Sequence, residues 1–583
     1  MQEQIIETKN CKQCGSSFDI TEKDIEFYDK ISPIFADKKY NIPTPKLCPE
    51  CRQQRRFCFS NERNFYKNQS SKSEKNLISI YSQDKNINVM EQGEWWKGDF
   101  DWLDYWKDVD FNKNLLTQYL ELHKKVPKQN LTTVNCHNSE FTNYLYNSKD
   151  CYLSVLSSNV ENGLYVTDSD SIKNSIDISW SNTIENSYEI FNSEHLYKSY
   201  YSTWCESSSY VVFCKDCVNC TNCVFCYWLR WKKYNILNEE YSKEEYENKL
   251  KELNLFTNNN ILEYKEIFYN FLLKKPQKYM NSSSSHNCTW DYIHSSTNCK
   301  NSFNVVNVEN WSYLYDCWRI KNITDCEKVY DWEWLILDTI ISDASYKILF
   351  SHNVSSSNNI YYSSDIFNSN NCFLCTWLKN KKFCIFNREY SEEEYYNMVE
   401  QIIEKMQENW QWWEFFPANL SPFWYNETVA GEYFPISSDS SSFNKKEWET
   451  ENNIFEFEYK WWTFNWSTYE APFPKVDKII PADKLPDSVG DIPDDVLNWA
   501  IKCEKTWKPF KITLQELEFY RKHNLPIPKR HPNERHLDKM KLRNPRKLFD
   551  RKCDKCWVDM KTTYAPDRPK IVYCEECYNK EIY

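Results

Sequence analysis

The residues with the clearest chemistry are eight cysteines in two groups of four, one near each end of the chain. Each group consists of two Cys-x-x-Cys pairs: Cys11, Cys14, Cys48 and Cys51, and Cys553, Cys556, Cys574 and Cys577. Four thiolates in two such pairs are typical of a closed, tetrahedral structural zinc site, whereas a catalytic zinc keeps one position open. The sequence therefore predicts two structural zinc ions as cofactors, and it predicts no catalytic residues.

The two ends of the chain are copies of each other. The segment "CKQCGSSFDITEKDIEFYDK" (11–30) aligns with "CEKTWKPFKITLQELEFYRK" (503–522), and after an insertion in the first copy "CPECR" (48–52) aligns with "HPNER" (531–535). Each end thus carries a tandem of two sites, of which one has lost its cysteines. The degenerate positions are Ser70, Ser73, Glu91 and Glu94 in the first copy and Cys503, Thr506, His531 and Glu534 in the second. We expect these to fold without metal; a weak site on Cys503 and His531 is the alternative.

The first group of cysteines lies in a pattern that resembles a known family. The pattern is Cys-x-x-Cys-Gly-x-x-Phe (11–18), then Glu-Phe-Tyr (26–28), then Cys-Pro-x-Cys-Arg (48–52), which is similar to the treble-clef "probable zinc-ribbon" family. More broadly, segments such as "EFFPANLSPFWYNETVA" and "ELEFYRKHNLPIPKRHPNERHLDKM" resemble a family of uncharacterised bacterial zinc-ribbon proteins from the candidate phyla radiation. This resemblance implies an architecture and no established activity.

The middle of the chain repeats every twelve residues from 136 onward. Small residues recur at Ser139, Cys151, Gly163, Ser175, Ser187 and Ser199, with further small residues halfway between. A fixed period with small residues at fixed positions predicts a β-solenoid, here with two short strands in each coil. A second copy follows, because "CVFCYWLRWKKYNILNEEYSKEEY" (223–246) matches "CFLCTWLKNKKFCIFNREYSEEEY" (372–395). Capping boxes at Ser242 and Ser391 predict a helix after each copy. Low-complexity disorder is the alternative.

Five further cysteines form a run at 214, 217, 220, 223 and 226. Iron–sulfur proteins use this kind of Cys-x-x-Cys spacing. However, the second repeat copy keeps only Cys372 and Cys375 of this run, and no Cys-Pro follows it. We therefore interpret the run as small side chains inside the solenoid, with a metal or iron–sulfur site as the alternative.

These observations predict the fold class and its divisions. At 583 residues the chain exceeds what one core supports, and with only 6 glycines it lacks phosphate-binding turns of the Rossmann or P-loop kind. We expect a mainly β protein with two solenoid-like repeat halves, each closed by a helix and flanked by duplicated zinc-ribbon or treble-clef modules. The predicted segments are an N-terminal tandem module (1–96), a helical connector (97–134), the first repeat half (135–232), a helical segment (233–280), the second repeat half (281–383), a helix (384–410), a Pro- and aromatic-rich connector (411–500) and a C-terminal tandem module (501–583).

Tryptophan outnumbers glycine by 25 to 6. Trp557 directly follows the second cysteine of a knuckle, where the N-terminal knuckle has Gly15 and where the backbone often turns through positive φ. In the resembling family, glycine is expected at the positions of Trp557, Trp507 and Trp424, and Trp106, Trp228, Trp377 and Trp413 look similar. We hypothesise that the source organism reads UGA as glycine, as some lineages of the candidate phyla radiation do. Genuine aromatic enrichment is the alternative, and genuine tryptophan is expected in "EWWK" (94–97).

Charge is distributed unevenly along the chain. The net charge is -12, yet residues 502–570 hold 20 Lys and Arg against nine Asp and Glu. Aromatic residues are interspersed among the basic residues of 51–69 and 539–552, a composition suited to phosphate contacts and base stacking. The candidate nucleic-acid contacts are Arg52, Arg55, Arg56, Arg63, Lys539, Lys541, Arg543, Arg546, Lys547 and Arg551. The alternative is a solvated basic face, or one that docks on the acidic body of the protein itself.

The predicted function is that of a non-enzymatic zinc-binding protein that binds RNA, DNA or a ribonucleoprotein such as the ribosome through its basic zinc modules. A scaffold that binds other proteins through its solenoid surface is the alternative. A metal-dependent enzyme has less support, because none of the 9 histidines lies in an H-E-x-x-H motif.

The start "MQEQIIETKN" lacks signal-peptide features, no run of 18 apolar residues occurs, and paired cysteines fit a reducing compartment. We therefore expect a cytoplasmic protein with no membrane partner.

Overall fold

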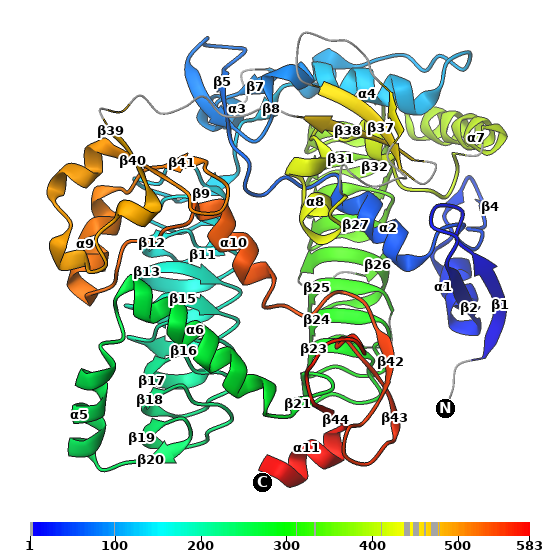
Figure 1. Ribbon diagram of the computed structural model, residues 1–583. Coiled ribbons are helices and arrows are strands. Elements are labelled where there is room, and N and C mark those ends of the chain that lie inside the picture. The colour runs from blue at the N-terminus through cyan, green and yellow to red at the C-terminus, as the bar shows by residue number, and fades with distance from the viewer. Residues whose placement is uncertain are drawn as a thin grey trace.

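The computed structural model describes residues 4–97, 100–309, 312–330, 334–409, 411–436, 444–446, 454–459, 462–467, 476 and 478–582, so the connector expected at 411–500 lies partly outside the described residues. Within them the chain is mainly β, and two large parallel sheets form its body (Figure 1). None of the helices in this part of the chain combines the length and the hydropathy that crossing a bilayer requires.

The first sheet, here the first repeat region, contains twelve strands. Successive strands pair in parallel with residues twelve positions later, as Asn182 does with Glu194 and Ile184 with Leu196. The final pair, β19–β20, is antiparallel. The strands are β9 (Thr133–Val134), β10 (Asn143–Tyr146), β11 (Val155–Ser158), β12 (Glu161–Leu164), β13 (Asp170–Ser179), β14 (Asn182–Glu185), β15 (Tyr188–Phe191), β16 (Glu194–Tyr197), β17 (Glu206–Val212), β18 (Thr221–Val224), β19 (Lys233–Ile236) and β20 (Glu239–Glu240).

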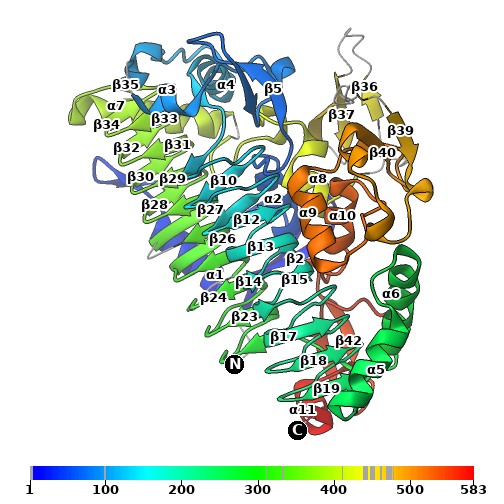
Figure 2. The ribbon, with the colours of Figure 1, turned by 90° about the vertical axis from the view of Figure 1, so that its left-hand side faces the viewer.

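The second sheet, here the second repeat region, has fourteen strands and lies beside the first, running in the opposite direction along the molecule (Figures 1 and 2). Its parallel pairs also step by twelve residues, except for eleven between Ser282 and Ile293 and thirteen between Lys321 and Trp334. Its final pair is antiparallel, as in the first sheet. The strands are β22 (Ser282–Ser283), β23 (Trp290–His294), β24 (Ser302–Val306), β25 (Leu314–Trp318), β26 (Lys321–Tyr330), β27 (Trp334–Asp343), β28 (Tyr346–Leu349), β29 (His352–Ser355), β30 (Asn358–Tyr361), β31 (Ser364–Phe367), β32 (Asn370–Phe373), β33 (Thr376–Lys379), β34 (Lys382–Ile385) and β35 (Arg388–Glu389).

The backbone of the first repeat region bends at regular intervals. Where the pattern is most even, each repeat holds two four-residue strands, such as β14 and β15, as the sequence predicted. In addition, every third residue from Asn135 to Leu237 has a positive φ, which gives four bends in each twelve-residue repeat. Asparagine tolerates this left-handed conformation better than most residues, and it occupies many of the bends, including Asn159, Asn162 and Asn174. The asparagine-rich composition therefore follows from the backbone geometry.

Serine side chains inside the repeats tie each one to the next. Ser169 Oγ accepts a hydrogen bond from the backbone N–H of Ser181 (3.1 Å) and donates one to the carbonyl of Thr167 (2.9 Å). Ser181 bonds in the same way to the N–H of Ser193 (3.2 Å). Further along the stack Cys214 takes such a position, and its Sγ donates to the carbonyl of Val212 (3.5 Å). The cysteine run therefore fills interior positions of the stack, as the sequence interpretation favoured.

Helices flank the two repeat regions. Both predicted capping boxes are present, at Ser242 before α5 and at Ser391 before α7. The apolar face of α7, which includes Tyr395 and Ile402, is buried. The helices are α1 (Glu22–Ile31), α2 (Pro49–Phe57), α3 (Gln92–Lys97), α4 (Leu115–Lys125), α5 (Lys243–Leu253), α6 (Asn258–Leu273), α7 (Glu392–Glu408), α8 (Val429–Tyr433), α9 (Leu514–His523), α10 (Pro532–Met540) and α11 (Glu575–Ile582).

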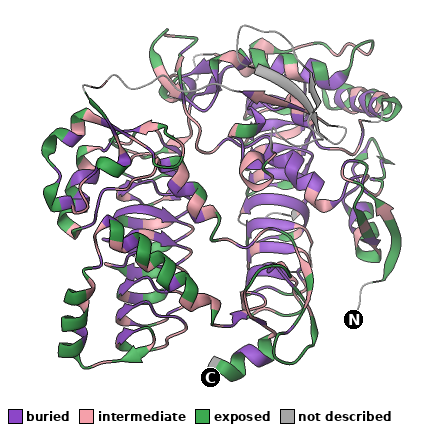
Figure 3. Ribbon diagram, in the orientation of Figure 1, coloured by how far each residue is buried: buried purple, intermediate pink, exposed green. Residues whose placement is uncertain are grey.

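The apolar core divides into an inside and an outside for each repeat region. Inside the first region lies a cluster that includes Ile172 and Ile184, and inside the second lies one that includes Ile336 and Ile360. Outside, the first region packs on α5, α6 and α9, and the second on α4, α7 and the N-terminal module. Figure 3 shows the strands of both regions largely buried and α5 largely exposed. The terminal modules are therefore part of the body of the protein.

The tryptophan hypothesis can be compared with the backbone. Five of the seven tryptophans that it names have positive φ: Trp228, Trp377, Trp413, Trp507 and Trp557. The other two do not, because φ is -52° at Trp106 and -82° at Trp424, so the expectation of a left-handed turn was wrong there. Trp557 (φ 63°) and Trp507 (φ 60°) follow their cysteine knuckles as Gly15 (φ 75°) does. Both indoles are largely exposed and therefore gain little from packing.

We expect the substitution Trp557→Gly to leave the protein as stable or to stabilise it by up to about 1 kcal/mol. A left-handed conformation costs a non-glycine residue roughly 1–2 kcal/mol, and the added flexibility of glycine offsets part of that gain. Trp95→Gly is the matched control, because the Trp95 side chain is fully buried and its Nε1 donates to the carbonyl of Pro127. It should lose at least about 3 kcal/mol. Urea unfolding measures both, and a comparable loss at the two positions would contradict the hypothesis.

Candidate metal centres and a cationic cleft

The first cysteine cluster joins a hairpin to a helix. The hairpin of β1 (Ile5–Asn10) and β2 (Ser17–Thr21) carries Cys11 and Cys14, while Cys48 is the N-cap of α2 and Cys51 lies in its first turn. The four Sγ atoms all lie within 4.8 Å of one another, and Cys14 Sγ is 3.6 Å from Cys48 Sγ. Hydrogen bonding from the Cys51 side chain lowers the pKa of Cys48 to about 5. The cluster can hold a metal ion, which would fix the start of α2.

The second cluster repeats this arrangement at the other end of the chain. Cys553 and Cys556 lie in the turn between β42 (Phe549–Lys552) and β43 (Asp559–Thr562), and Cys574 and Cys577 lie at the start of α11. These Sγ atoms also lie within 4.8 Å of one another. Burial alone would raise the pKa of Cys553, but hydrogen bonds from backbone amides, among them that of Cys556, lower it to about 6. Thiolates are metal ligands, so this environment suits a metal ion.

The degenerate sites have replaced their ligands with other contacts. Ser70 Oγ donates a hydrogen bond to Glu94, and this bond lowers the pKa of Glu94. In the other copy His531 Nδ1 accepts from the N–H of Asn533 (3.1 Å) and caps α10. The two four-cysteine clusters are the only groups of potential ligands with metal-binding spacing in the described part of the chain. Neither Cys503 with His531 nor the cysteine run at 214–226 is among them.

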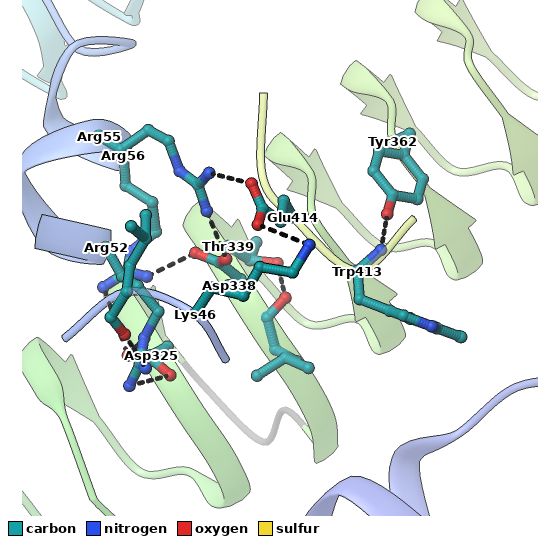
Figure 4. Close-up of polar contacts among 12 residues, drawn as sticks. Lys46, Arg52, Arg55, Arg56, Asp325, Asp338, Thr339, Tyr362, Trp413 and Glu414 are labelled. Atoms are coloured by element: carbon teal, nitrogen blue, oxygen red, sulfur yellow. Dashed lines mark hydrogen bonds and ion pairs between the residues drawn. The ribbon is translucent and has the colours of Figure 1, made fainter. Parts of the chain in front are cut away.

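The arginines of α2 are buried against the second repeat region. Arg52 forms a two-pronged ion pair with Asp325 (Nε–Oδ1 3.0 Å, Nη2–Oδ2 2.9 Å). Arg56 is fully buried and binds Glu327 through Nε (2.8 Å) and Nη2 (3.0 Å), and its Nη1 binds Asp338. Figure 4 shows Arg55 between Asp338 and Glu414 in the same cluster. These three side chains are neutralised by the protein's own carboxylates.

The C-terminal module docks on the first repeat region in the same way. Arg535 of α10, which aligns with Arg52, is buried and paired with Asp177 of β13. Lys539, which aligns with Arg56, also pairs with Asp177 (3.2 Å). Asp177 and Asp325 both sit at positive-φ bends of long strands. Each terminal module therefore uses one helix to grip the repeat region that is farther from it in sequence.

These contacts correct the interpretation of five candidate nucleic-acid contacts. Arg52, Arg55, Arg56, Lys539 and Arg546 are buried, and Arg546 pairs with Asp316 (2.8 Å). They dock the modules on the acidic body, which was the alternative interpretation of the basic stretches. The other five are at least partly exposed: Arg63, Lys541, Arg543, Lys547 and Arg551.

A cleft of about 650 Å³ opens between the first repeat region, α6 and the C-terminal module. Its lining contains nine basic side chains and three acidic ones, so its charge is strongly positive. The basic residues are Lys215, Lys265, Lys529, Arg530, Arg535, Lys539, Lys541, Arg568 and Lys570, and the acidic residues are Glu189, Glu504 and Asp538. Aromatic side chains complete the walls, among them Tyr188, Trp204 and Tyr269.

Four cations of the cleft have no carboxylate paired with them among the described residues: Lys215, Lys529, Arg568 and Lys570. Each of the other basic residues of the cleft pairs with a carboxylate. For example, Lys265 pairs with Glu189 (2.7 Å) and Lys541 pairs with Asp538 (3.2 Å). Burial and the nearby Lys570 ammonium lower the pKa of Lys215 to about 7. Burial and Arg568 likewise lower the pKa of Lys570. Such mutual repulsion would be relieved by a bound anion.

The same place in the second repeat region is filled. In the alignment of the two repeat copies Ser364 stands where Lys215 does, and its Oγ accepts a hydrogen bond from the Tyr119 hydroxyl of α4 (2.8 Å). Tyr362, which aligns with Phe213, stacks on Trp412 (5.9 Å between ring centroids). The corresponding position is therefore covered by packed side chains in the second repeat region, whereas in the first it lines an open, basic cleft.

The C-terminal cysteine cluster helps to shape the cleft. The loop between β43 and β44 (Val572–Tyr573) carries Arg568 and Lys570, and β44 pairs with β21 (Gln277–Lys278). From α11, the Tyr578 hydroxyl donates to Asp216 (2.9 Å), which also pairs with Arg230 (2.9 Å). The carboxylate next to Lys215 is thus occupied by other partners.

Sequence reasoning located only part of this cleft. Lys539 and Lys541 were among the candidate contacts, and the basic stretch 502–570 includes Lys529, Arg568 and Lys570. Lys215 and Lys265 carried no signal, because they come from a repeat and a helix that meet the C-terminal module only through tertiary packing.

Comparisons with known proteins do not assign the chain. No family model matches it, and no curated protein matches it. Among solved structures, a crystal structure described as an acetyltransferase from Desulfovibrio desulfuricans G20 is 11% identical and covers 48% of this chain and 75% of its own, with a TM-score of 0.09. A likeness of that size carries no argument about fold or function.

Proposed function

We propose that this protein is a non-enzymatic nucleic-acid-binding protein that holds a single strand in the basic cleft beside the first repeat region. The observation that carries the proposal is the set of four cations, Lys215, Lys529, Arg568 and Lys570, that face one cleft with no carboxylate paired with them among the described residues. Phosphates would pair with these cations, and bases would stack on aromatic side chains such as Tyr269, which is half exposed.

The two cysteine clusters support a structural role for metal in this proposal. Zinc is the ion that suits four thiolates in two Cys-x-x-Cys pairs, and each cluster is closed by its four ligands. We propose that both are zinc-ribbon or treble-clef modules whose ions fix α2 and α11, and that the repeat regions are β-solenoids that serve as a rigid body. RNA, DNA or a ribonucleoprotein such as the ribosome would be the partner.

A purely structural scaffold for other proteins is the second candidate. It is favoured by the burial of five of the ten candidate basic contacts, which shows that basic residues here also serve internal docking. The two candidates differ in salt dependence, because phosphate contacts release counterions and so weaken steeply with ionic strength.

We expect the double substitution Arg568→Glu with Lys570→Glu to weaken binding of single-stranded RNA or DNA and to reduce the slope of log K against log salt by about 2. Each phosphate contact contributes about 1 to that slope. Fluorescence anisotropy of the full chain with a labelled oligonucleotide, across a salt series, measures both quantities.

The matched control is Lys552→Glu with Lys561→Glu. Both side chains are exposed, belong to the same module and lie outside the cleft lining. This control variant changes the net charge by the same amount as the test variant. Its slope of log K against log salt should stay within about 0.5 of the wild-type slope, because it removes no phosphate contact in the cleft. No binding by the wild type at low salt, or equal losses in both variants, would refute the proposal and favour the scaffold.

A further inference from the structure

The amine of Lys215 lies in an unusual setting on the wall of the cleft. It donates a hydrogen bond to Gln277 Oε1 (2.7 Å), a neutral acceptor, and its Nζ lies 5.7 Å from the centre of the Tyr227 ring. Its neighbour Asp216 is committed to Arg230 and Tyr578. The amine therefore faces the cleft without a counter-ion to hold it in the ammonium form.

The charged groups around Lys215 act in opposite directions. Lys570, from the loop before β44, disfavours the ammonium, whereas Asp216 on the same repeat and Asp291 on β23 favour it. Burial adds to the effect of Lys570, and together they lower the pKa of Lys215 to about 7. An ordinary lysine has a pKa near 10.4, so at neutral pH its neutral fraction is smaller by roughly a thousandfold.

We propose that Lys215 is an imine-forming residue that captures an aldehyde or ketone carrying a phosphate or carboxylate group. Arg568, Lys570 and Lys529 hold the anionic group, and the neutral amine of Lys215 meets the carbonyl carbon. A C–N bond forms, the carbonyl oxygen takes up the two nitrogen-bound protons and leaves as water, and a C=N double bond remains. The step needs no oxidant or reductant, and lysines deprotonated by burial beside another cation are activated in this way.

Comparison of the two repeat regions supports a binding site at Lys215 rather than a gap left by poor packing. The position of Lys215 holds Ser364 in the second repeat region, where Tyr119 covers it. The lysine therefore occurs in the half in which the surface is open and basic. This inference does not depend on nucleic-acid binding, since any anionic carbonyl compound of suitable size tests it.

Pyridoxal 5′-phosphate, which joins an aldehyde to a phosphate, is the probe. The full-length protein is incubated with it, trapped with borohydride and mapped by peptide mass spectrometry. We expect Lys215 to be labelled at least about tenfold faster than the exposed Lys552 at pH 7, because far more of its amine is neutral. Labelling of Lys215 should rise between pH 6 and 8, and inorganic phosphate should suppress it while leaving Lys552 unaffected.

The variant Lys215→Arg should lose this label and keep its thermal stability, because arginine has no primary amine but still donates hydrogen bonds. Labelling of Lys215 no faster than of Lys552, or with the same pH dependence, would overturn the proposal on the wild-type protein alone. Absence of oligonucleotide binding by the wild type would refute the proposed function but would not affect the labelling result. The two failures are therefore distinguishable.

Discussion

Replacing Arg56 by alanine should lower the free energy of unfolding by about 3–5 kcal/mol, because the substitution leaves Glu327 and Asp338 buried without their main partner. The Arg56 side chain is fully buried and joins α2 to two strands of the second repeat region, β26 and β27. Well-packed apolar residues often stabilise a protein as much as a buried ion pair does. The loss in Arg56→Ala therefore arises from the two buried carboxylates that remain without their arginine. Urea unfolding followed by tryptophan fluorescence measures it.

Two further variants separate this cause from lost packing. Arg56→Met combined with Glu327→Gln removes both charges, and its destabilisation should be smaller than the sum of the single losses, since the two groups are in contact. Arg388→Ala removes an exposed arginine that pairs with Asp108, and it should change stability by no more than about 1 kcal/mol. A loss at Arg56 no greater than that at Arg388 would show that the buried cluster does not hold the module in place.

Loss of one metal ion should destabilise its own module more than the loss of Arg56 does. Structural zinc contributes on the order of 10 kcal/mol to small modules of this kind, so Cys51→Ser and Cys577→Ser should each unfold one module and remove one ion per chain. Metal content by elemental mass spectrometry and limited proteolysis measure the two consequences. Cys503→Ser is the matched control, because Cys503 is buried in a knuckle outside both clusters, and its variant should keep both ions.

The two cysteine variants should differ in their effect on the cleft. Cys577 lies in α11, which also carries Tyr578, so its loss should release Asp216 and the loop with Arg568 and Lys570. Oligonucleotide binding should then fall in Cys577→Ser and persist in Cys51→Ser. Equal losses in both variants would indicate that the cleft depends on the whole body rather than on its adjacent module.

The amino-acid sequence alone determined the local and periodic features. The cysteines of each cluster lie within one module, the twelve-residue period appears directly in the strand register, and the capping boxes at Ser242 and Ser391 begin helices where predicted. Each of these depends on residues close in the chain, where spacing fixes geometry. The positive φ at Trp557 and Trp507 was predictable for the same reason, from the shared knuckle pattern.

Only the tertiary structure decided what the charges do. Arg52 meets Asp325 and Arg535 meets Asp177 across hundreds of residues, and the sequence contains no signal for such pairings. It therefore could not distinguish arginines that dock a module from cations that face a cleft. Lys215 belongs to the second kind because Asp216 is engaged by Arg230 and Tyr578, and because α6 and the C-terminal module leave space beside it. Charge composition reveals how many basic groups a segment has, whereas their function depends on which carboxylates folding brings to them.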